Sequence, residues 1–253
     1  MEVKVLGAYG GEGPGLRSSC ILINNRIALD AGALTSGLSL SDQVKVNVIM
    51  ISHTHLDHIQ DLGFIADNVF GKRSEPIRII GLAKSIQIIQ KHIMNNKVWP
   101  DFSKIPNPEH PVVSYQAIKA GEEIKVEGLT LKAIPVNHPV PSAAFIINDG
   151  KSSLIYTGDS GVTERLWKEA DKLNSLRLVM IEVSFPNRLQ GLAEITGHLT
   201  PKMAEAELKK LAIQGFQARA FHLKPNFLAE LKSELAKTKP KIIPLEQGEV
   251  IEI

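Results

Sequence analysis

Three histidines and one aspartate lie within six residues, at His53, His55, Asp57 and His58. They directly follow the apolar run 46–51, which is typical of a buried strand. In an extended chain, residues two apart point the same way, so His53 and His55 can converge on one cation. Asp57 and His58 would then begin the next helix and serve a neighbouring position. Imidazoles assisted by carboxylates favour zinc, manganese or iron over calcium and magnesium.

Four ligands from one segment cannot complete a site for two metal ions, so further ligands are expected elsewhere in the chain. Three candidates each follow a strand-like stretch, as ligands gathered along one edge of a sheet would: His138, Asp159 and His222. Taken singly, either histidine is more often a structural residue, and Asp159 a turn or helix cap. Their occurrence together with the cluster favours ligation.

The elements that must position these residues alternate between strands and helices, which is typical of a layered α/β fold. Apolar runs and alternation predict strands at 46–51, 129–133, 153–157, 178–181 and 249–253. Apolar residues at helical spacing predict helices at 82–93, from Thr200-Pro201 to Ala212, and around 228–235. A glycine-rich loop spans 7–15, and a proline-rich irregular excursion spans 95–116. No domain boundary is visible, so we expect one domain over residues 1–253.

The composition is that of a globular chain: of 253 residues, 43% are hydrophobic and 22% charged, which excludes wholesale disorder. The net charge of +2 argues against a nucleic-acid binder that relies on bulk charge. Cys20 is the single cysteine, so no internal disulfide can form, as suits a reducing compartment. No apolar run could span a membrane and no secretory leader is visible, so we expect a cytoplasmic protein.

The string HTHLDH, followed in order by His138, Gly-Asp159 and His222, resembles the metal-ligand motifs of the metallo-β-lactamase superfamily. The resemblance implies an αββα sandwich with two divalent transition-metal ions at the sheet edge. Zinc is the first expectation, with manganese or iron as alternatives. On this template His53, His55 and His138 hold the first ion. The second is held by Asp57, His58 and His222, and Asp159 bridges the two. Asp30, in a turn that also resembles the superfamily, is either a brace for the ligand loop or a plain turn residue.

Two further stretches, 181–187 (IEVSFPN) and 196–201 (TGHLTP), resemble motifs of the class II cyclic-nucleotide phosphodiesterases, as does HTHLDH itself. The likeness is continuous from about 139 to 211. One departure is Asp61, where the family pattern has a small residue.

His198 lies within the second of these stretches and is not needed as a ligand. The resemblance implies that it approaches the scissile phosphate, where it would protonate the leaving alkoxide. Glu182 would orient His198 through a hydrogen bond, and Asp57 counts among the catalytic residues as well as the ligands. The alternative makes His198 a helix-start residue bonded to the backbone. His92 and His110 are expected on the surface or in packing.

These features predict a metal-dependent phosphodiesterase that hydrolyses a 3′,5′-cyclic nucleotide to the 5′-monophosphate. The loop 8–15 and the excursion 95–116 are candidate walls of the base pocket. The alternatives are a ribonuclease Z-like nuclease, a thioester hydrolase or lactonase of the same fold, and a non-catalytic metal-binding module. The expected partner is a small cyclic nucleotide, with neither a membrane nor a nucleic acid. Related phosphodiesterases also suggest a homodimer.

Overall fold

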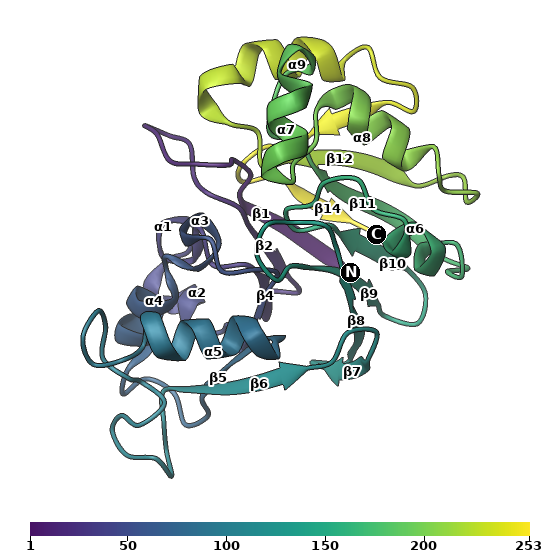
Figure 1. Cartoon of the computed structure of the whole chain (residues 1–253). Coiled ribbons are helices and arrows are strands. Elements are labelled where there is room, and N and C mark those ends of the chain that lie inside the picture. Colours follow the sequence, from purple (N-terminus) through teal and green to yellow (C-terminus); the bar gives the residue numbers. More distant parts are fainter.

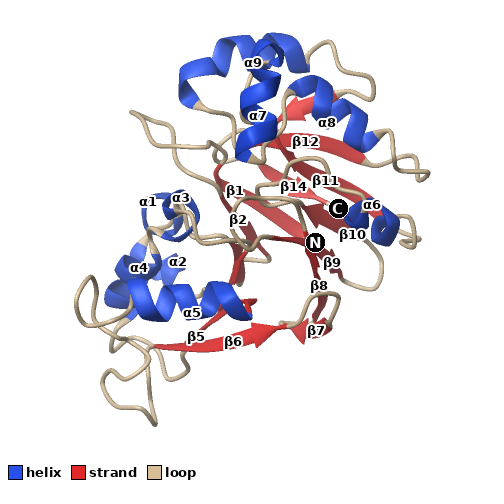
Figure 2. Ribbon diagram, in the orientation of Figure 1, coloured by secondary structure: helices blue, strands red, loops and turns tan.

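The computed structural model describes residues 1–253 and contains two seven-stranded sheets packed face to face (Figures 1 and 2). In hydrogen-bonding order, the first sheet consists of β14 (Val250–Glu252), β1 (Glu2–Gly7), β2 (Cys20–Ile23), β3 (Ile27–Leu29), β4 (Val48–Ile51), β5 (Ile77–Leu82) and β6 (Val113–Ile118). The second sheet consists of β13 (Ile242–Pro244), β12 (Gln217–Phe221), β11 (Leu176–Glu182), β10 (Ser153–Tyr156), β9 (Ala143–Asn148), β8 (Leu129–Pro135) and β7 (Glu123–Val126).

Both sheets change from antiparallel to parallel pairing along their width. In the first sheet the change falls at β3, which pairs antiparallel with β2 and parallel with β4. In the second it falls at β10, between antiparallel β9 and parallel β11. The parallel strands are covered on both faces, which explains why β4 and β10 are continuously buried runs.

The helices cover the two outer faces (Figure 2). The first sheet is covered by α1 (Leu34–Gly37), α2 (Leu40–Gln43), α3 (Leu56–Ile59), α4 (Leu62–Val69) and α5 (Ala83–His92). The second is covered by α6 (Arg165–Ala170), α7 (Gln190–Thr196), α8 (Pro201–Leu208) and α9 (Leu228–Leu235). Two short 3₁₀ turns, η1 (Asn187–Leu189) and η2 (Pro225–Phe227), precede α7 and α9. No helix has the length and apolar character needed to cross a membrane.

Three apolar clusters fill the spaces between these layers. The central cluster joins the inner faces of both sheets, with residues such as Val5 and Met50 from the first and Phe145 and Met180 from the second. The other two clusters lie between each sheet and its own helices. Four layers packed over three cores confirm the expected αββα sandwich.

Most predicted helices and strands are present. Two predicted boundaries were wrong: the end of the helix that begins at Thr200-Pro201, and the end of the excursion 95–116. The Thr200 side chain accepts a hydrogen bond from the Met203 amide and caps α8, as expected. The helix nevertheless stops at Leu208: the Lys210 and Leu211 amides bond to carbonyls three residues back, and the Ala212 amide donates to the Asp171 carboxylate. The irregular excursion ends before Val113, because residues 113–118 pair in parallel with β5.

Candidate active site

The predicted ligands lie beyond strand ends or in the short helix that follows one. His53 and His55 follow β4, and Asp57 and His58 lie in α3. The remaining ligands follow three strands of the second sheet: His138 after β8, Asp159 after β10 and His222 after β12. The structure brings all seven together in two adjacent groups.

The first group contains His53, His55, His138 and Asp159, whose ligand atoms all lie within 4.8 Å of one another. His138 Nε2 is 3.2 Å from His55 Nδ1, and His53 Nε2 is 3.6 Å from Asp159 Oδ2. Such close approach of imidazole nitrogens and a carboxylate suits a shared cation.

The second group contains Asp57, His58 and His222, also within 4.8 Å. His222 Nε2 is 3.2 Å from Asp57 Oδ2 and 3.2 Å from Asp159 Oδ2, and His58 Nε2 is 3.3 Å from Asp159 Oδ1. Asp159 therefore faces both groups.

Three buried polar atoms in these groups make no hydrogen bond of suitable geometry: His53 Nε2, His58 Nε2 and Asp159 Oδ1, of which the last two face each other at 3.3 Å. Burying an unpaired nitrogen or carboxylate oxygen is costly, and such atoms usually find a partner. Divalent cations at the two groups would accept lone pairs from all three atoms. The donor set of imidazoles and carboxylates thus fits transition-metal ions.

The electrostatics favour metal ligation at the first group. Burial lowers the pKa of His53 well below its usual value, and burial also lowers the pKa of His138 to about 4. These imidazoles are therefore neutral at neutral pH and offer lone pairs. Burial by itself would raise the pKa of Asp159, but the surrounding histidines, His222 first, hold it well below the usual range. The imidazoles of His53 and His138 are therefore neutral beside an ionised Asp159 carboxylate, whereas the pKa of His58 is raised by Asp159 and Asp30 in spite of its burial.

Asp30 braces the ligand loop, so of its two interpretations the structure supports the first. Its carboxylate accepts hydrogen bonds from the Ser52 amide at 2.8 Å and from the Ser52 hydroxyl at 2.7 Å. It is also 2.8 Å from His58 Nδ1 and accepts from the Tyr156 hydroxyl at 2.8 Å. Asp30 has a positive φ of 58°, a conformation that is uncommon outside glycine and asparagine and that clusters at functional sites. Tyr156 was not predicted, because a tyrosine in a buried strand looks like core packing.

His198 lies beside the ligands, in the loop that follows the left-handed cap Gly197 of α7. Its Nδ1 is 3.1 Å from Glu182 Oε1, and its ring is stacked on His222 with centroids 5.4 Å apart. The alternative of a side chain bonded to backbone is therefore not what the structure contains. His198 also comes within 4.8 Å of Asp159 and His222. Burial lowers the pKa of His198, while burial and the Asp159 carboxylate raise that of Glu182. His92 and His110 are exposed, as expected.

The glycine-rich loop lies directly against a ligand. A Cβ at Gly10 would lie 2.6 Å from the His222 ring, so only glycine allows this approach. The other candidate pocket wall, the excursion, lies on α4, where Trp99 contacts Phe64 edge to face. Phe102 of that segment is buried in the layer between the first sheet and its helices.

Asp61, the departure from the family pattern, has a structural role. Its carboxylate accepts a hydrogen bond from the Thr35 amide at 2.7 Å. The N-cap residue of α1, Ala33, provides no side-chain cap of its own. Asp61 thus satisfies an amide that a helix start would otherwise leave unpaired.

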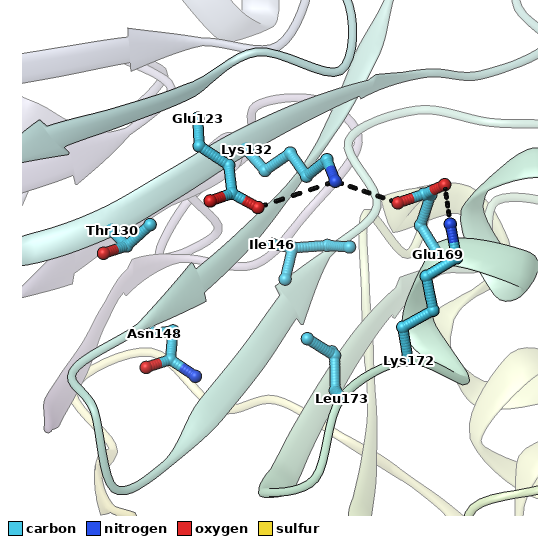
Figure 3. Close-up of a pocket in the computed structure, with 8 residues that line it drawn as sticks. All are labelled: Glu123, Thr130, Lys132, Ile146, Asn148, Glu169, Lys172 and Leu173. Carbon is cyan, nitrogen blue, oxygen red and sulfur yellow. Dashed lines mark hydrogen bonds and ion pairs between the residues drawn. The ribbon is translucent and has the colours of Figure 1, made fainter.

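A separate groove lies between α6 and the strands β7, β8 and β9 (Figure 3). Lys132 lies between Glu123 at 3.6 Å and Glu169 at 2.9 Å, and Lys172 contacts Glu169 at 2.6 Å. These charges compensate one another, and no predicted ligand lines the groove. It has the character of a solvated surface.

Comparison with known proteins relates this site to a family. A probable 3′,5′-cyclic-nucleotide phosphodiesterase of Yersinia pestis is 25% identical, over 89% of this chain and 79% of that protein. The structure of unliganded yeast PDE1 superposes with a TM-score of 0.81 at 20% identity, covering 100% of this chain and 99% of that one. The metallo-β-lactamase fold protein YhfI from Bacillus subtilis superposes with a TM-score of 0.76 at 21% identity, covering 100% and 99%. The fold is therefore the metallo-β-lactamase fold. The model of the class-II cAMP phosphodiesterases matches residues 39–250, and the chain belongs to this family.

Proposed function

We propose that the chain hydrolyses 3′,5′-cyclic nucleotides to 5′-monophosphates at the histidine-rich site. Membership of the class-II family supports the substrate class. The observation that carries the proposal is the set of three unpartnered buried atoms, His53 Nε2, His58 Nε2 and Asp159 Oδ1, at the meeting point of two ligand groups. A site of this composition suits hydrolysis of a phosphodiester.

Two divalent ions, zinc first, are proposed for the two groups. His53, His55 and His138 would hold one ion, Asp57, His58 and His222 the other, and Asp159 would contact both. Bound there, such ions supply Lewis-acid chemistry: they lower the pKa of water and neutralise charge on phosphate oxygens. Asp30 keeps His58 in the ligating orientation through its Nδ1.

His198 is proposed to protonate the ribose 3′ oxygen as it leaves phosphorus. Its Nδ1 is held by Glu182 and Ser184, and its Nε2 makes no hydrogen bond within the chain. The free Nε2 is therefore the atom that can deliver a proton. A lowered pKa makes the imidazolium a stronger acid, and the hydrogen bond between its Nδ1 and Glu182 orients the ring. Asp57 is the more exposed of the two ligand carboxylates, with 28% of its side chain accessible, so it can also face the substrate.

The test is a comparison of substrates on the purified, metal-loaded protein. Cyclic AMP, cyclic GMP, a bis-nitrophenyl phosphodiester, a tRNA precursor and a thioester are assayed side by side, with wild type, Asp159→Asn and the surface control His92→Ala. We expect the 5′-monophosphate from a cyclic nucleotide, lost in Asp159→Asn and kept in His92→Ala. Cleavage of the tRNA precursor without turnover of either cyclic nucleotide would favour the ribonuclease Z-like alternative and contradict the proposal.

We further propose that residues 1–253 act as one domain, since the central core draws on strands from both halves of the chain. The buried free thiol of Cys20 is compatible with a cytoplasmic location. A homodimer stays a prediction, which sedimentation of the purified protein can test.

A further inference from the structure

The hydroxyl of Ser184 lies between two histidines that have different proposed roles. Ser184 is fully buried and follows the end of β11. Its Oγ is 2.8 Å from Nδ1 of the ligand His222 and 3.2 Å from Nδ1 of His198, and it donates to Glu182 Oε2 at 3.1 Å. One side chain therefore contacts a metal ligand, the proposed proton donor and the carboxylate beside it.

The direction of each hydrogen bond follows from the proton on His222. Its Nε2 faces Asp57 and Asp159, so a neutral ring that ligates through Nε2 carries its proton on Nδ1. That N–H donates to Ser184 Oγ. A hydroxyl has one proton and two lone pairs, so Ser184 is left to donate its proton to Glu182.

Both carboxylate oxygens of Glu182 accept hydrogen bonds. Its Oε1 accepts from the Leu199 amide at 3.0 Å and lies 3.1 Å from His198 Nδ1, and its Oε2 accepts from Ser184. With Nδ1–H of His198 directed at Glu182, Nε2 of that ring is left for the substrate. The hydrogen bonds thus run from His222 through Ser184 to Glu182, and from His198 to the same carboxylate.

We propose that Ser184 is a positioning residue that holds the ligand His222 and the proton donor His198 in one hydrogen-bonded unit through Glu182. The inference rests on the proposed metal site and goes beyond it, because no ligand role is assigned to Ser184 or Glu182. The backbone keeps the unit in place: the Ser184 amide donates to the Leu199 carbonyl at 3.0 Å, and the Val183 amide donates to the Phe221 carbonyl at 2.9 Å. Loss of the hydroxyl would leave the ring of His222 without its acceptor.

The test measures metal affinity and needs no substrate. Metal-free protein is titrated with zinc against a chelator, and the two binding steps are resolved for wild type, Ser184→Ala, Ser184→Thr and Glu182→Gln. Partners of metal-ligating histidines typically contribute about 10–100-fold to affinity. We expect Ser184→Ala to weaken the ion bound at Asp57, His58 and His222 by that factor and to leave the other ion unchanged. Ser184→Thr, which keeps the hydroxyl, restores binding. Glu182→Gln weakens the same ion although Glu182 contacts no ligand of that group.

A matched control is Ser153→Ala, which removes another fully buried hydroxyl, at the start of β10 and so at the other end of the sheet. Nitrogen-proton spectra of the zinc-loaded protein give a second readout, in which the Nδ1–H signal of His222 is protected in wild type and lost in Ser184→Ala. Unchanged zinc affinity in Ser184→Ala or in Glu182→Gln overturns the proposal. The proposal is also overturned if Ser184→Ala lowers the zinc affinity of both ions and Ser153→Ala lowers it in the same way. Because no step uses a nucleotide, these results stand even if the protein hydrolyses another substrate.

Discussion

Replacement of His198 tests the mechanism most directly, because His198 is the proposed proton donor and is not a proposed metal ligand. Protonation of a leaving group by a positioned side chain contributes about 10²–10⁴-fold to the rate. At about 1.4 kcal/mol per tenfold, His198→Ala should therefore raise the barrier for cyclic AMP by about 3–5 kcal/mol. The Nε2 atom makes no hydrogen bond within the chain, so most of this loss should come from chemistry rather than folding.

The leaving group distinguishes proton donation from other roles. A nitrophenolate leaves without protonation, so His198→Ala should cost about tenfold or less on a bis-nitrophenyl phosphodiester. The assay compares kcat and KM for both substrates under saturating metal. Equal losses on the two substrates would refute the reasoning and indicate charge stabilisation or phosphate binding by His198.

His198 lies within 4.8 Å of Asp159 and His222, so its replacement could also release a metal ion and lower activity for that reason. Two controls distinguish this effect from loss of the proton donor. Metal content is measured on every variant. His198→Asn places an amide nitrogen where Nδ1 donates to Glu182, so it keeps that hydrogen bond and lacks Nε2. It should match His198→Ala in activity and wild type in metal content. If His198→Asn retained full activity on cyclic AMP, donation from Nε2 would be excluded.

Two further predictions concern the metal site, and a third concerns the stability of the fold. Asp57→Ala should leave about one ion per chain by elemental analysis, because Asp57 belongs to only one ligand group; loss of both ions would contradict two separate positions. Gly10→Ala should displace the His222 ring and weaken the same ion, whereas Gly13→Ala, whose Cβ would meet Leu16 at an ordinary 3.6 Å, should bind zinc as wild type does. Glu207→Leu should lower the free energy of unfolding by about 1–3 kcal/mol in denaturant titration, because it leaves the Thr163 amide and the Trp167 indole without the carboxylate oxygen that accepts from both. An unchanged midpoint would show that these bonds add no net stability.

The convergence of the seven candidate ligands could be predicted from the sequence, because each is a chemically distinctive side chain in or after a segment that follows an apolar run. Asp30 was visible in the same way, although its two interpretations could not be separated before its donors were known. Ser184 and Tyr156 were out of reach, since a serine in a loop and a tyrosine in a strand have many ordinary uses. Their roles depend on atoms from strands far apart in the sequence, which brings Tyr156 within 2.8 Å of Asp30.

The errors in the fold arose where tertiary contacts override local preference. Leu211 is apolar and buried at the spacing that suits α8, yet the neighbouring amide of Ala212 is captured by Asp171. Residues 113–116 follow a proline-rich stretch, yet they pair with residues 77–80 of β5. Neither partner is near in sequence, so periodicity alone could not reveal the competition.

Two aspartates at corresponding places in the two sheets have different roles. Asp30 braces the loop that carries the candidate ligands, whereas Asp159 is a proposed metal ligand. Asp30 follows β3 and Asp159 follows β10, the strands at which each sheet changes from antiparallel to parallel pairing. Binding sites of α/β folds commonly lie beyond the carboxyl ends of strands. Asp30 is surrounded there by an amide, two hydroxyls and His58 Nδ1, so its lone pairs are used within the protein. Asp159 meets histidine nitrogens instead and keeps a buried oxygen without a partner. The number of protein donors around each carboxylate, rather than its position in the fold, therefore decides which of the two is free to bind a cation.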